Sequence, residues 1–442
     1  MNRYTLELPM RGGWIRIWVI ALVALGLAAP VLSAANLNSR MIPHEEAQQL
    51  GLTRAWFGHI DLDPARNHVE RAILTGNRLT VLTSAGVVQE FDAETGQSLW
   101  TAPIGNENYP SLGPTASDKY VALVNGSTLY VLDRADGRPI IIRRVGGAPG
   151  AAPALSQDFV FVPLVRGRIE AYPLSLDKKT APWYYQSYGR MMVAPLATPE
   201  TVVWTTDAGY LYVGNSTKAG MRYRMETGSD IVAPPAFLKP YVFVASTSGE
   251  VFAMQEDSGI RRWKYSTGFP IERTPAPVGD RVFVSTAEPS LHCINALTGD
   301  MLWEAPRVSQ FAAASKTKVY GVDNLGALVV LDGASGRQLG RIAVDRPIHS
   351  LVNQDTDRLF LISREGVIEC LREIDSKEPF VHPKPVATAP PVAGETAEPA
   401  AEAAAMDDPA EATTADEPAT EEQPPKPAED FGVEDSDNPF GE

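Results

Sequence analysis

The stretch Ala93–Trp100 reads AETGQSLW, and Ala296–Trp303 reads ALTGDMLW. In both, a glycine follows a threonine, and an indole follows the glycine four residues later. Glycine at this place allows the positive φ of a tight turn between antiparallel strands, and the tryptophan then falls in the next strand. Two copies of one turn-and-strand pattern so far apart indicate an internal repeat.

Two series of turns run through the chain in step with this pattern. Turns related to those of the two quoted stretches occur at Gly96, Gly137, Gly220, Gly259, Gly299 and Gly336. A second series follows β-branched or aromatic runs, with 37 to 42 residues between turns, at Gly86, Gly126, Gly167, Gly209, Gly249, Pro289, Gly326 and Gly366. A period near 40 residues made of short strands is typical of a β-propeller, in which each repeat forms one blade.

Short runs rich in β-branched and aromatic residues lie between these turns and predict the strands. Four of them are Tyr120–Val124, Phe159–Val162, Tyr241–Val244 and Arg281–Ser285. Their nearly continuous apolar character suits strands buried on both faces between neighbouring blades. Each blade is therefore predicted to contain a strand, a glycine turn, a strand, a second glycine turn and a strand with an indole. This indole is Trp100, Trp263 or Trp303, with Trp183 at the same phase in the third blade.

The second series of turns predicts eight blades, but the eighth ends near Leu371 without its outer strand. The segment 55–62 reads as a strand ahead of the first complete repeat. Pairing it with the last blade would close the ring and remove its exposed edges. Ahead of that strand, residues 44–50 predict a short helix that ends at Gly51. The fold class is therefore all-β, an eight-bladed β-propeller closed by an N-terminal strand over residues 52–374.

The quoted stretches resemble the A-x-T-G-x-x-x-W repeat of the pyrroloquinoline-quinone-like (PQQ-like) propellers, which two blades match fully and the others in part. That family contains quinoprotein alcohol dehydrogenases and the non-catalytic BamB-like proteins, which serve outer-membrane β-barrel assembly. The resemblance covers about residues 52 to 374. It implies the propeller fold, and it leaves the activity open because one fold hosts many functions.

For a quinoprotein dehydrogenase, the resemblance would imply a quinone stacked on an indole in the central channel, a disulfide between adjacent cysteines, and acidic and amide ligands for calcium. This chain departs from that pattern. Its two cysteines, Cys293 and Cys370, lie in predicted strands two blades apart, and we expect them to be buried thiols. Trp204 is the one repeat indole outside the repeated phase, and packing is its expected role.

No motif of catalysis rescues the enzyme hypothesis. The chain has no G-x-S-x-G, H-E-x-x-H or phosphate-binding loop, and its six histidines fall at unrelated phases of the repeat. We therefore predict no catalytic residue, no cofactor-binding residue and no metal ligand. The indoles and glycines of the repeat are predicted to pack blades together.

The flanks have a different composition. Arginines followed by an apolar run from Ile17 to Ala29 and small residues up to Ala35 predict a signal peptide over 1–35, or an uncleaved anchor, so the propeller is expected outside the cytoplasm. Residues 36–51 would form a cap. From 375 to 442 there are 18 Asp and Glu against 3 Lys, which is 3 − 18 = −15 and equals the whole net charge. This Pro-, Ala- and Glu-rich tail is predicted to be disordered.

A candidate partner-binding rim lies at the starts of the innermost strands, which approach the mouth of the central channel in a propeller. Mixed charges favour a protein or peptide partner over a polyanion, and ordinary solvated charges are the alternative. The residues of this rim are Glu70, Arg71, Arg190, Asp230, Glu272, Arg273 and His349.

The sequence thus favours a BamB-like scaffold of the periplasm or cell envelope, a monomeric propeller that binds an envelope protein or peptide. The neutral propeller, with 36 basic and 36 acidic side chains before residue 375, argues against nucleic acid as a partner. Membrane association would come through the N-terminal segment or a partner. The alternatives are a quinone-dependent oxidoreductase or degenerate relative, and a carbohydrate-binding propeller with exposed aromatic residues at the blade mouths.

Overall fold

The computed structural model describes residues 41–175, 181–344 and 348–384. All of them belong to one of the two units of the chain, Met1–Ala400. The predicted signal peptide and residues 385–442 of the predicted acidic tail lie outside the described residues. Among the described residues, no helix is both long and apolar enough to cross a membrane.

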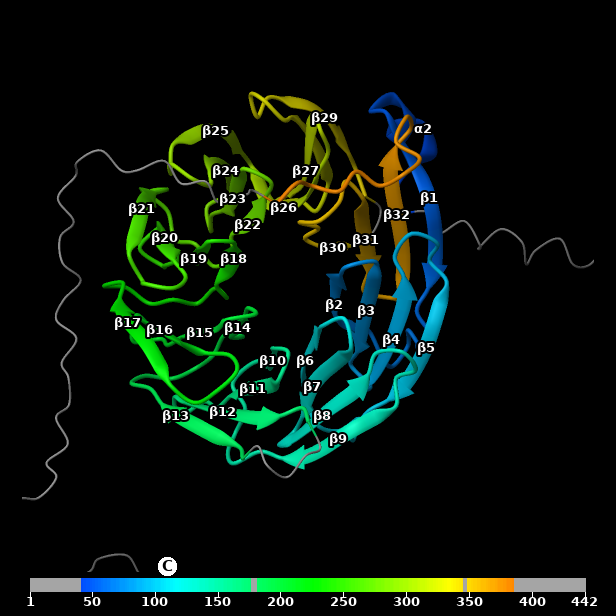
Figure 1. The fold of residues 1–442 in the computed structure, drawn as a ribbon. Helices are drawn as coiled ribbons and strands as arrows, with labels where there is room; N and C mark the ends of the chain where they lie inside the picture. The colour runs from blue at the N-terminus through cyan, green and yellow to red at the C-terminus, as the bar shows by residue number, and fades with distance from the viewer. Residues whose placement is uncertain (1–40, 176–180, 345–347, 385–442) are drawn as a thin grey trace, which may run out of the picture. The chain divides into compact units, whose positions relative to one another are not determined.

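Eight four-stranded antiparallel sheets follow one another around a ring, and each sheet is one blade (Figure 1). Blades 1 and 2 contain β2 (Val69–Thr75), β3 (Arg78–Thr83), β4 (Val87–Asp92), β5 (Ser98–Pro103), β6 (Ser111–Ala116), β7 (Tyr120–Asn125), β8 (Thr128–Asp133) and β9 (Pro139–Arg144). Blades 3 and 4 contain β10 (Ala154–Leu155), β11 (Phe159–Pro163), β12 (Arg168–Pro173), β13 (Trp183–Gln186), β14 (Leu196–Ala197), β15 (Thr201–Thr205), β16 (Tyr210–Asn215) and β17 (Met221–Glu226).

The second half of the chain continues the series. Blades 5 and 6 contain β18 (Ala236–Leu238), β19 (Tyr241–Ala245), β20 (Glu250–Gln255), β21 (Arg261–Ser266), β22 (Ala276–Val278), β23 (Arg281–Ser285), β24 (Ser290–Asn295) and β25 (Met301–Pro306). Blade 7 contains β26 (Val308–Ala314), β27 (Lys318–Asp323), β28 (Leu328–Asp332) and β29 (Gln338–Ile342). Blade 8 contains β30 (Ile348–Ser350), β31 (Leu359–Ser363), β32 (Val367–Glu373) and β1 (Leu52–His59).

The predicted ring closure is confirmed. Strand β1 pairs antiparallel with β32, from Leu52 opposite Glu373 to His59 opposite Val367. The N-terminus thus supplies the outer strand of the last blade, and the first and last parts of the sequence share one sheet. The predicted helix is also present as α2 (His44–Gln49), and Gly51 follows it with φ 76°. Helix α2 and its flanks pack on blades 7 and 8 through Met41, Ile42, Ala47 and Leu50.

Each blade has one more strand than the sequence pattern predicted. The second and third strands are the buried apolar runs seen in the sequence, such as β15 and β19, in which every residue is buried. The additional strand is the innermost one, which has only two residues in β10 and β14. Two residues are too few to show the alternation that identifies a strand, so β10 and β14 could not be recognised from the sequence.

The repeat indoles pack blades together. Trp100 donates its Nε1–H to the carbonyl of Arg134 in blade 2, 2.9 Å away, and a Cβ on Gly137 would overlap its ring. A side chain in place of Gly137 would therefore displace the indole. The backbone φ of 75° at Gly137 favours glycine as well. The same contact joins Trp263 to Gly299 and Trp303 to Gly336, whereas the ring of Tyr223 lies against Gly259.

The closing strand carries an indole of this kind that the sequence analysis did not assign. Trp56 of β1 donates to the Ala93 carbonyl at 2.9 Å and lies against Gly96 of blade 1. Trp183 has the predicted phase but packs within its own blade, edge-on to Phe159 and Phe161. Trp204 is buried and stacks on Tyr212 at 5.6 Å between ring centroids, so its predicted packing role is confirmed.

The chain continues beyond β32 as an extended segment, residues 375–384, which we call the strap. Figure 1 shows it crossing from β32 past blade 7. The Phe380 N–H donates to Asp357 Oδ1 at 3.0 Å, Thr356 and Val381 form a β-bridge, and the ring of His382 contacts the Ala314 carbonyl at 3.0 Å. The strap begins at the predicted tail boundary and is held against blades 7 and 8.

Candidate functional site

The topology of the blades sorts their loops onto two faces of the ring. In a four-stranded antiparallel blade, the turn between the second and third strands lies on the same side as the connection that enters the blade. Backbone hydrogen bonds join this turn to the entering connection in three successive blades. Asp207 N–H donates to the Arg190 carbonyl, Thr247 N–H to Asp230, and Ala287 N–H to Pro270, at 2.8 to 3.0 Å. We call this side the connection face.

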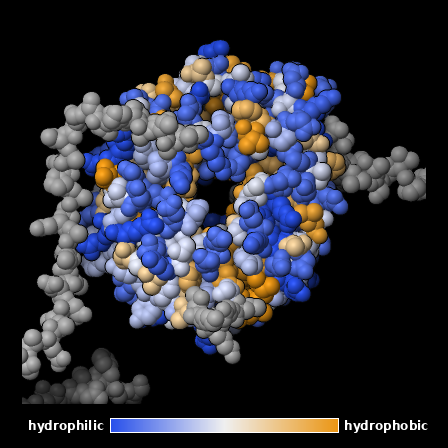
Figure 2. Space-filling model, viewed as in Figure 1, coloured by the Kyte–Doolittle hydropathy of each residue, from blue (hydrophilic) through white to orange (hydrophobic). Residues whose placement is uncertain are grey.

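A cavity of about 550 Å³ occupies the middle of the ring. Figure 2 looks along the ring axis and shows the opening. All eight blades or the connections that enter them contribute side chains to the lining, from Glu70 in blade 1 to Val352 in blade 8. The channel walls are mostly small or apolar, and the exceptions are Gln310 and four charged side chains, Glu70, Arg71, Glu272 and Arg273.

Three consecutive connections repeat with a spacing of 40 residues, and this repeat decides which side chains reach the channel. Met191, Ile231 and Ile271 occupy equivalent places and are buried, so each fixes its connection against the blade. The next residues, Met192, Val232 and Glu272, all line the cavity. The residues just before the buried anchors are Arg190, Asp230 and Pro270, whose carbonyls bind the neighbouring turns.

The predicted rim residues therefore fall into three groups. Glu70, Arg71, Glu272 and Arg273 come together in the channel lining. Arg190 and Asp230 are exposed on the connection face and are not part of that lining. His349 lies in β30, where it pairs with Ile362, and its side chain is outside the described part of the structure.

Arg190 is held by an ion pair with Asp207 of the next turn. Its Nε donates to Asp207 Oδ2 at 2.6 Å, and its backbone N–H donates to Oδ1 at 2.7 Å. Burial alone would raise the pKa of Asp207, but these hydrogen bonds outweigh it and leave the pKa below its usual value. The Arg190 side chain is 70% exposed in spite of this pair, so its remaining donors face solvent.

Arg273 links two blades at the channel wall. Its Nη1 donates to Oε1 of Gln310 in β26 at 3.1 Å, so the guanidinium spans the junction between blades 6 and 7. Oε2 of Glu70 lies 3.3 Å from Nε2 of His68, on the same side of the propeller as Arg273. Both charges remain exposed, which suits recognition of a partly polar surface.

The connection face also presents apolar side chains that sequence reasoning missed or could not place. Tyr109, Tyr188, Met192, Val232 and Phe269 belong to connections between blades and are 40% to 71% exposed. Scattered exposed apolar residues are ordinary, and others lie on outer strands and turns, such as Ile142 and Leu325, but these five share the entering connections of the connection face. The 40-residue spacing of the anchors was the signal that could have found Met192 and Val232.

One titratable pair lies away from the channel. The hydroxyl of Tyr265 in β21 and Nδ1 of His292 in β24 are 3.1 Å apart, between blades 5 and 6. Burial lowers the pKa of His292, against the opposing effect of Glu304. No group of three or more His, Cys, Asp or Glu side chains within the described ranges is arranged to hold a metal ion. The channel mouth itself offers apolar contact beside charges of both signs.

The blades, their glycine turns and the indole contacts define the class of the protein: it is an eight-bladed propeller of PQQ-like repeats. The family model described as outer membrane protein assembly factor BamB matches residues 84–233 and 201–378. The chain therefore belongs to the BamB family.

One sequence relative and two solved structures are similar to this chain. The outer membrane protein assembly factor BamB of Burkholderia pseudomallei (strain K96243) is 24% identical over 281 residues, which is 61% of this chain and 64% of the relative. The match thus spans less than two thirds of that relative's length. The crystal structure of BamB from Moraxella catarrhalis has a TM-score of 0.59 at 18% identity and covers 73% of this chain and 98% of that one. The computationally designed Ika8 protein has a TM-score of 0.57 at 16% identity, covering 71% and 98%. These two similarities support the fold alone.

Proposed function

We propose that this chain is a non-catalytic scaffold of the cell envelope that binds an envelope protein or a peptide segment of one, in outer-membrane or envelope protein assembly. The observation that carries the proposal is the composition of the channel mouth. Met192 and Val232 supply apolar contact beside Glu272 and Arg273, which supply both signs of charge. Protein interfaces combine an apolar centre with a polar, charged rim in this way.

Membership of the BamB family supports the same proposal. The name of the Burkholderia relative states that it is an assembly factor for outer membrane proteins. A scaffold also fits the geometry, because the eight blades fix the entering connections rigidly and the loops are free to differ in sequence. A partner bound there would meet a preformed surface, which reduces the entropy lost on binding.

Reversing two positive charges on the connection face is expected to weaken partner capture at least about tenfold, or about 1.4 kcal/mol. The variant is Arg190→Glu with Arg273→Glu in the full chain. A photo-reactive amino acid at Met192, which is 53% exposed, would record the partner in intact cells as a cross-linked adduct.

The matched control is Arg138→Glu with Arg337→Glu, which changes the net charge equally at exposed sites in turns on the side of the ring opposite the connection face. Asp207→Asn is a second control, because it releases Arg190 without removing its charge. Equal adduct yields from the charge-reversed and parent chains would contradict the proposed site.

A quinone-dependent oxidoreductase is the first alternative, and titration of the full chain with pyrroloquinoline quinone and calcium tests it. We expect no saturable change in tryptophan fluorescence and no dye-linked alcohol oxidation. Trp204, the indole outside the repeated phase, is buried in blade 4 and is absent from the cavity lining. A quinone would therefore need another aromatic platform. Saturable binding with turnover would overturn the scaffold proposal.

A carbohydrate-binding propeller is the second alternative. It would need exposed aromatic rings at the blade mouths; Trp204 is buried, whereas Tyr109 is 57% exposed. Tyr109 belongs to the connection into blade 2, and Tyr188 to the connection into blade 4. The exposed apolar set also includes Met192 and Val232, which offer packing without hydrogen bonds and suit a protein partner better than a sugar.

A further inference from the structure

The chain that enters blades 3 to 6 runs along the channel wall before each innermost strand begins. In all four blades, the residue two places ahead of the innermost strand lines the cavity, and in blades 4 to 6 so does an exposed residue two places earlier, at the mouth. We call these the entry residues: Ala152, Ala194, Pro234 and Thr274 beside the strands, and Met192, Val232 and Glu272 at the mouth. The main chain of the connections therefore forms much of the wall in this half of the channel.

The backbone groups of the entry residues have no backbone partner inside the protein. The hydrogen-bonded ladders of the four blades begin at Ala154, Leu196, Ala236 and Ala276, just beyond these residues. Across residues 41–175, 181–344 and 348–384, no hydrogen bond joins an N–H or C=O group of an entry residue to another backbone group. Backbone groups of a folded chain are nearly always paired, with protein or with water. At a channel wall, a ligand can take the place of water as the partner.

Small residues leave room for a second main chain beside these groups. Two of the four entry residues beside the strands are alanines, and Gly113 and Gly150 also belong to the cavity lining. The cavity volume of about 550 Å³ is typical of ligand sites. An extended polypeptide carries one N–H and one C=O group for each rise of about 3.3 Å, and it binds unpaired strand edges through these groups. The wall therefore suits an extended segment of chain.

Two guanidinium groups at the same mouth have no carboxylate partner. Arg71 of blade 1 and Arg273 of blade 6 line the cavity and are exposed. Within the described ranges, neither guanidinium lies within 4.0 Å of a carboxylate oxygen, and Arg273 donates to the neutral amide of Gln310. A guanidinium binds a carboxylate with paired hydrogen bonds. The segment that enters is therefore expected to carry a carboxylate, on an acidic side chain or at a C-terminus.

We propose that the channel mouth receives an extended segment of the partner polypeptide. The main chain of this segment binds the backbone groups of the entry residues, and its carboxylate binds Arg71 or Arg273. The inference rests on the proposed function and adds that the partner enters the channel. A folded partner surface that only covers the connection face is the alternative, and the experiment below separates the two.

Filling the channel below its mouth tests whether the partner enters. The variant is Ala152→Trp with Thr274→Trp in the full chain, which places an indole on each of two blades and leaves Met192 free for the photo-reactive amino acid. The indoles would occupy the space of the entering segment. We therefore expect the yield of the adduct cross-linked from position 192 in intact cells to fall at least about tenfold.

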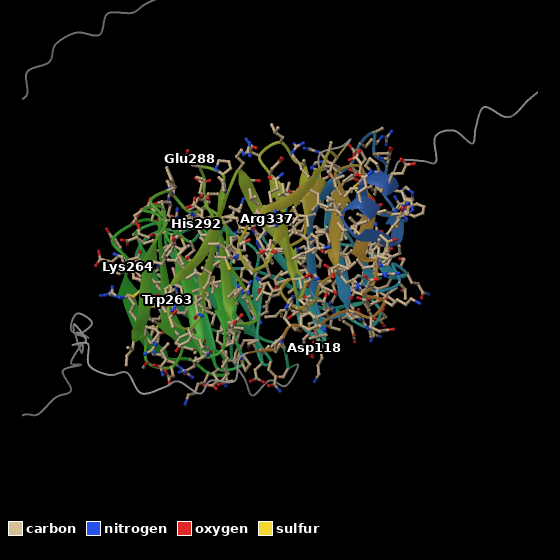
Figure 3. The ribbon with its side chains drawn as sticks, turned by 90° about the horizontal axis from the view of Figure 1, so that it is seen from above. Asp118, Trp263, Lys264, Glu288, His292 and Arg337 are labelled. Carbon is tan, nitrogen blue, oxygen red and sulfur yellow. The ribbon has the colours of Figure 1, made fainter. Side chains whose placement is uncertain are left out.

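The matched control adds the same two indoles at exposed turns on the opposite side of the ring, Ala135→Trp with Thr317→Trp. Figure 3 shows the ring from its edge, with Asp118 of a turn on that side and Glu288 of the connection face at opposite margins. The control chain should give the parental yield of adduct. Equal melting temperatures of the two variants would show that the filled chain is folded.

A second measurement needs no filled channel. The photo-reactive amino acid is placed at Met192 in one chain and at Thr274 in another, and the attachment sites on the partner are read by mass spectrometry. One extended segment would be cross-linked from both positions within about ten residues of its sequence. A synthetic peptide of that stretch should bind the full chain at least about tenfold more weakly when alternate amides are N-methylated, because each methyl group removes a donor.

The same peptide tests the charge. Replacing its carboxylate with an amide should weaken binding to the parent chain about tenfold and leave binding to the Arg71→Gln with Arg273→Gln variant unchanged.

Three results would overturn the entry of a segment: a filled chain with the parental adduct yield, attachment sites far apart in the partner's sequence, or a peptide that N-methylation leaves equally tight. In each of them the adduct from position 192 of the parent chain would still support the proposed function, with the partner docked on the connection face. Absence of any adduct from the parent chain would instead contradict the proposed function, and this inference with it.

Discussion

A chain that lacks residues 52–64 is expected to lose the cooperative unfolding transition of the intact ring. The deletion removes β1, so β32 loses its outer partner along its whole length from Glu373 to Val367. It also removes Arg54, the ion-pair partner of Glu369, and a buried carboxylate without its cation costs several kcal/mol. Urea unfolding followed by tryptophan fluorescence would measure the change in the free energy of unfolding.

Point variants distinguish the effect of losing ring closure from the effect of removing a segment of the chain. Trp56→Ala is expected to cost about 3 kcal/mol, because it empties the contact with Gly96 and leaves the Ala93 carbonyl without its donor. Trp56→Phe keeps most of the ring and should cost about 1 kcal/mol, the value of the lost hydrogen bond. Leu99→Ala on the exposed side of β5 is the neutral control. A deletion variant that unfolds like the parent would refute closure by β1.

Arg134→Met is expected to destabilise the protein by about 3 to 5 kcal/mol, because it leaves the buried carboxylate of Glu90 without its positively charged partner. Arg134 and Glu90 are almost fully buried, and Arg134 Nε donates to Glu90 Oε1 at 2.7 Å. The guanidinium also donates to the carbonyls of Ser117 and Thr75, at 2.6 Å and 3.1 Å. One side chain in the turn of blade 2 thus binds the Glu90 carboxylate and the Thr75 carbonyl of blade 1 and the Ser117 carbonyl of blade 2.

The double variant Arg134→Met with Glu90→Leu distinguishes the cost of an unpaired Glu90 carboxylate from the cost of the packing lost with Arg134. It removes both ions together, so we expect it to recover at least half of the loss seen with Arg134→Met alone. Arg78, whose guanidinium donates to the Arg134 carbonyl at 2.7 Å, is the matched control, and Arg78→Met should cost less than about 2 kcal/mol. Equal stabilities of the single and double variants would contradict a role for the charge.

The sequence predicted the propeller because its turns need glycine and its strands need continuous apolar runs, and both recur along most of the chain. It predicted the closing strand because the eighth repeat ends at β32 and an unpaired strand remained at the N-terminus. It did not predict the role of Trp56, since this indole stands more than 300 residues before β32, the strand with which it pairs, and has no turn ahead of it to set its phase.

The channel site was harder to predict for a physical reason. Whether a side chain in a connection reaches the channel depends on where the chain is anchored, and the anchors Met191, Ile231 and Ile271 look like any other apolar residues. Arg190 stands one residue before its anchor and is exposed on the connection face, whereas Arg273 stands two residues after its anchor and lies in the channel wall. The strap was hidden by its composition, because Ser376–Lys384 is polar and proline-containing and its order comes from contacts with Asp357 and Ala314.

The indole contacts give the ring a direction. Each one runs from the outer strand of one blade to the glycine turn of the following blade, so a blade offers a projection on one side and a matching recess on the other. Blades 5, 6 and 7 are joined by two successive contacts of the same kind, Trp263 with Gly299 and Trp303 with Gly336. Excising one such repeat would bring an indole opposite an equivalent glycine. The chemistry of these junctions therefore permits gain or loss of whole blades during evolution, and the angle needed to close the circle is what limits their number.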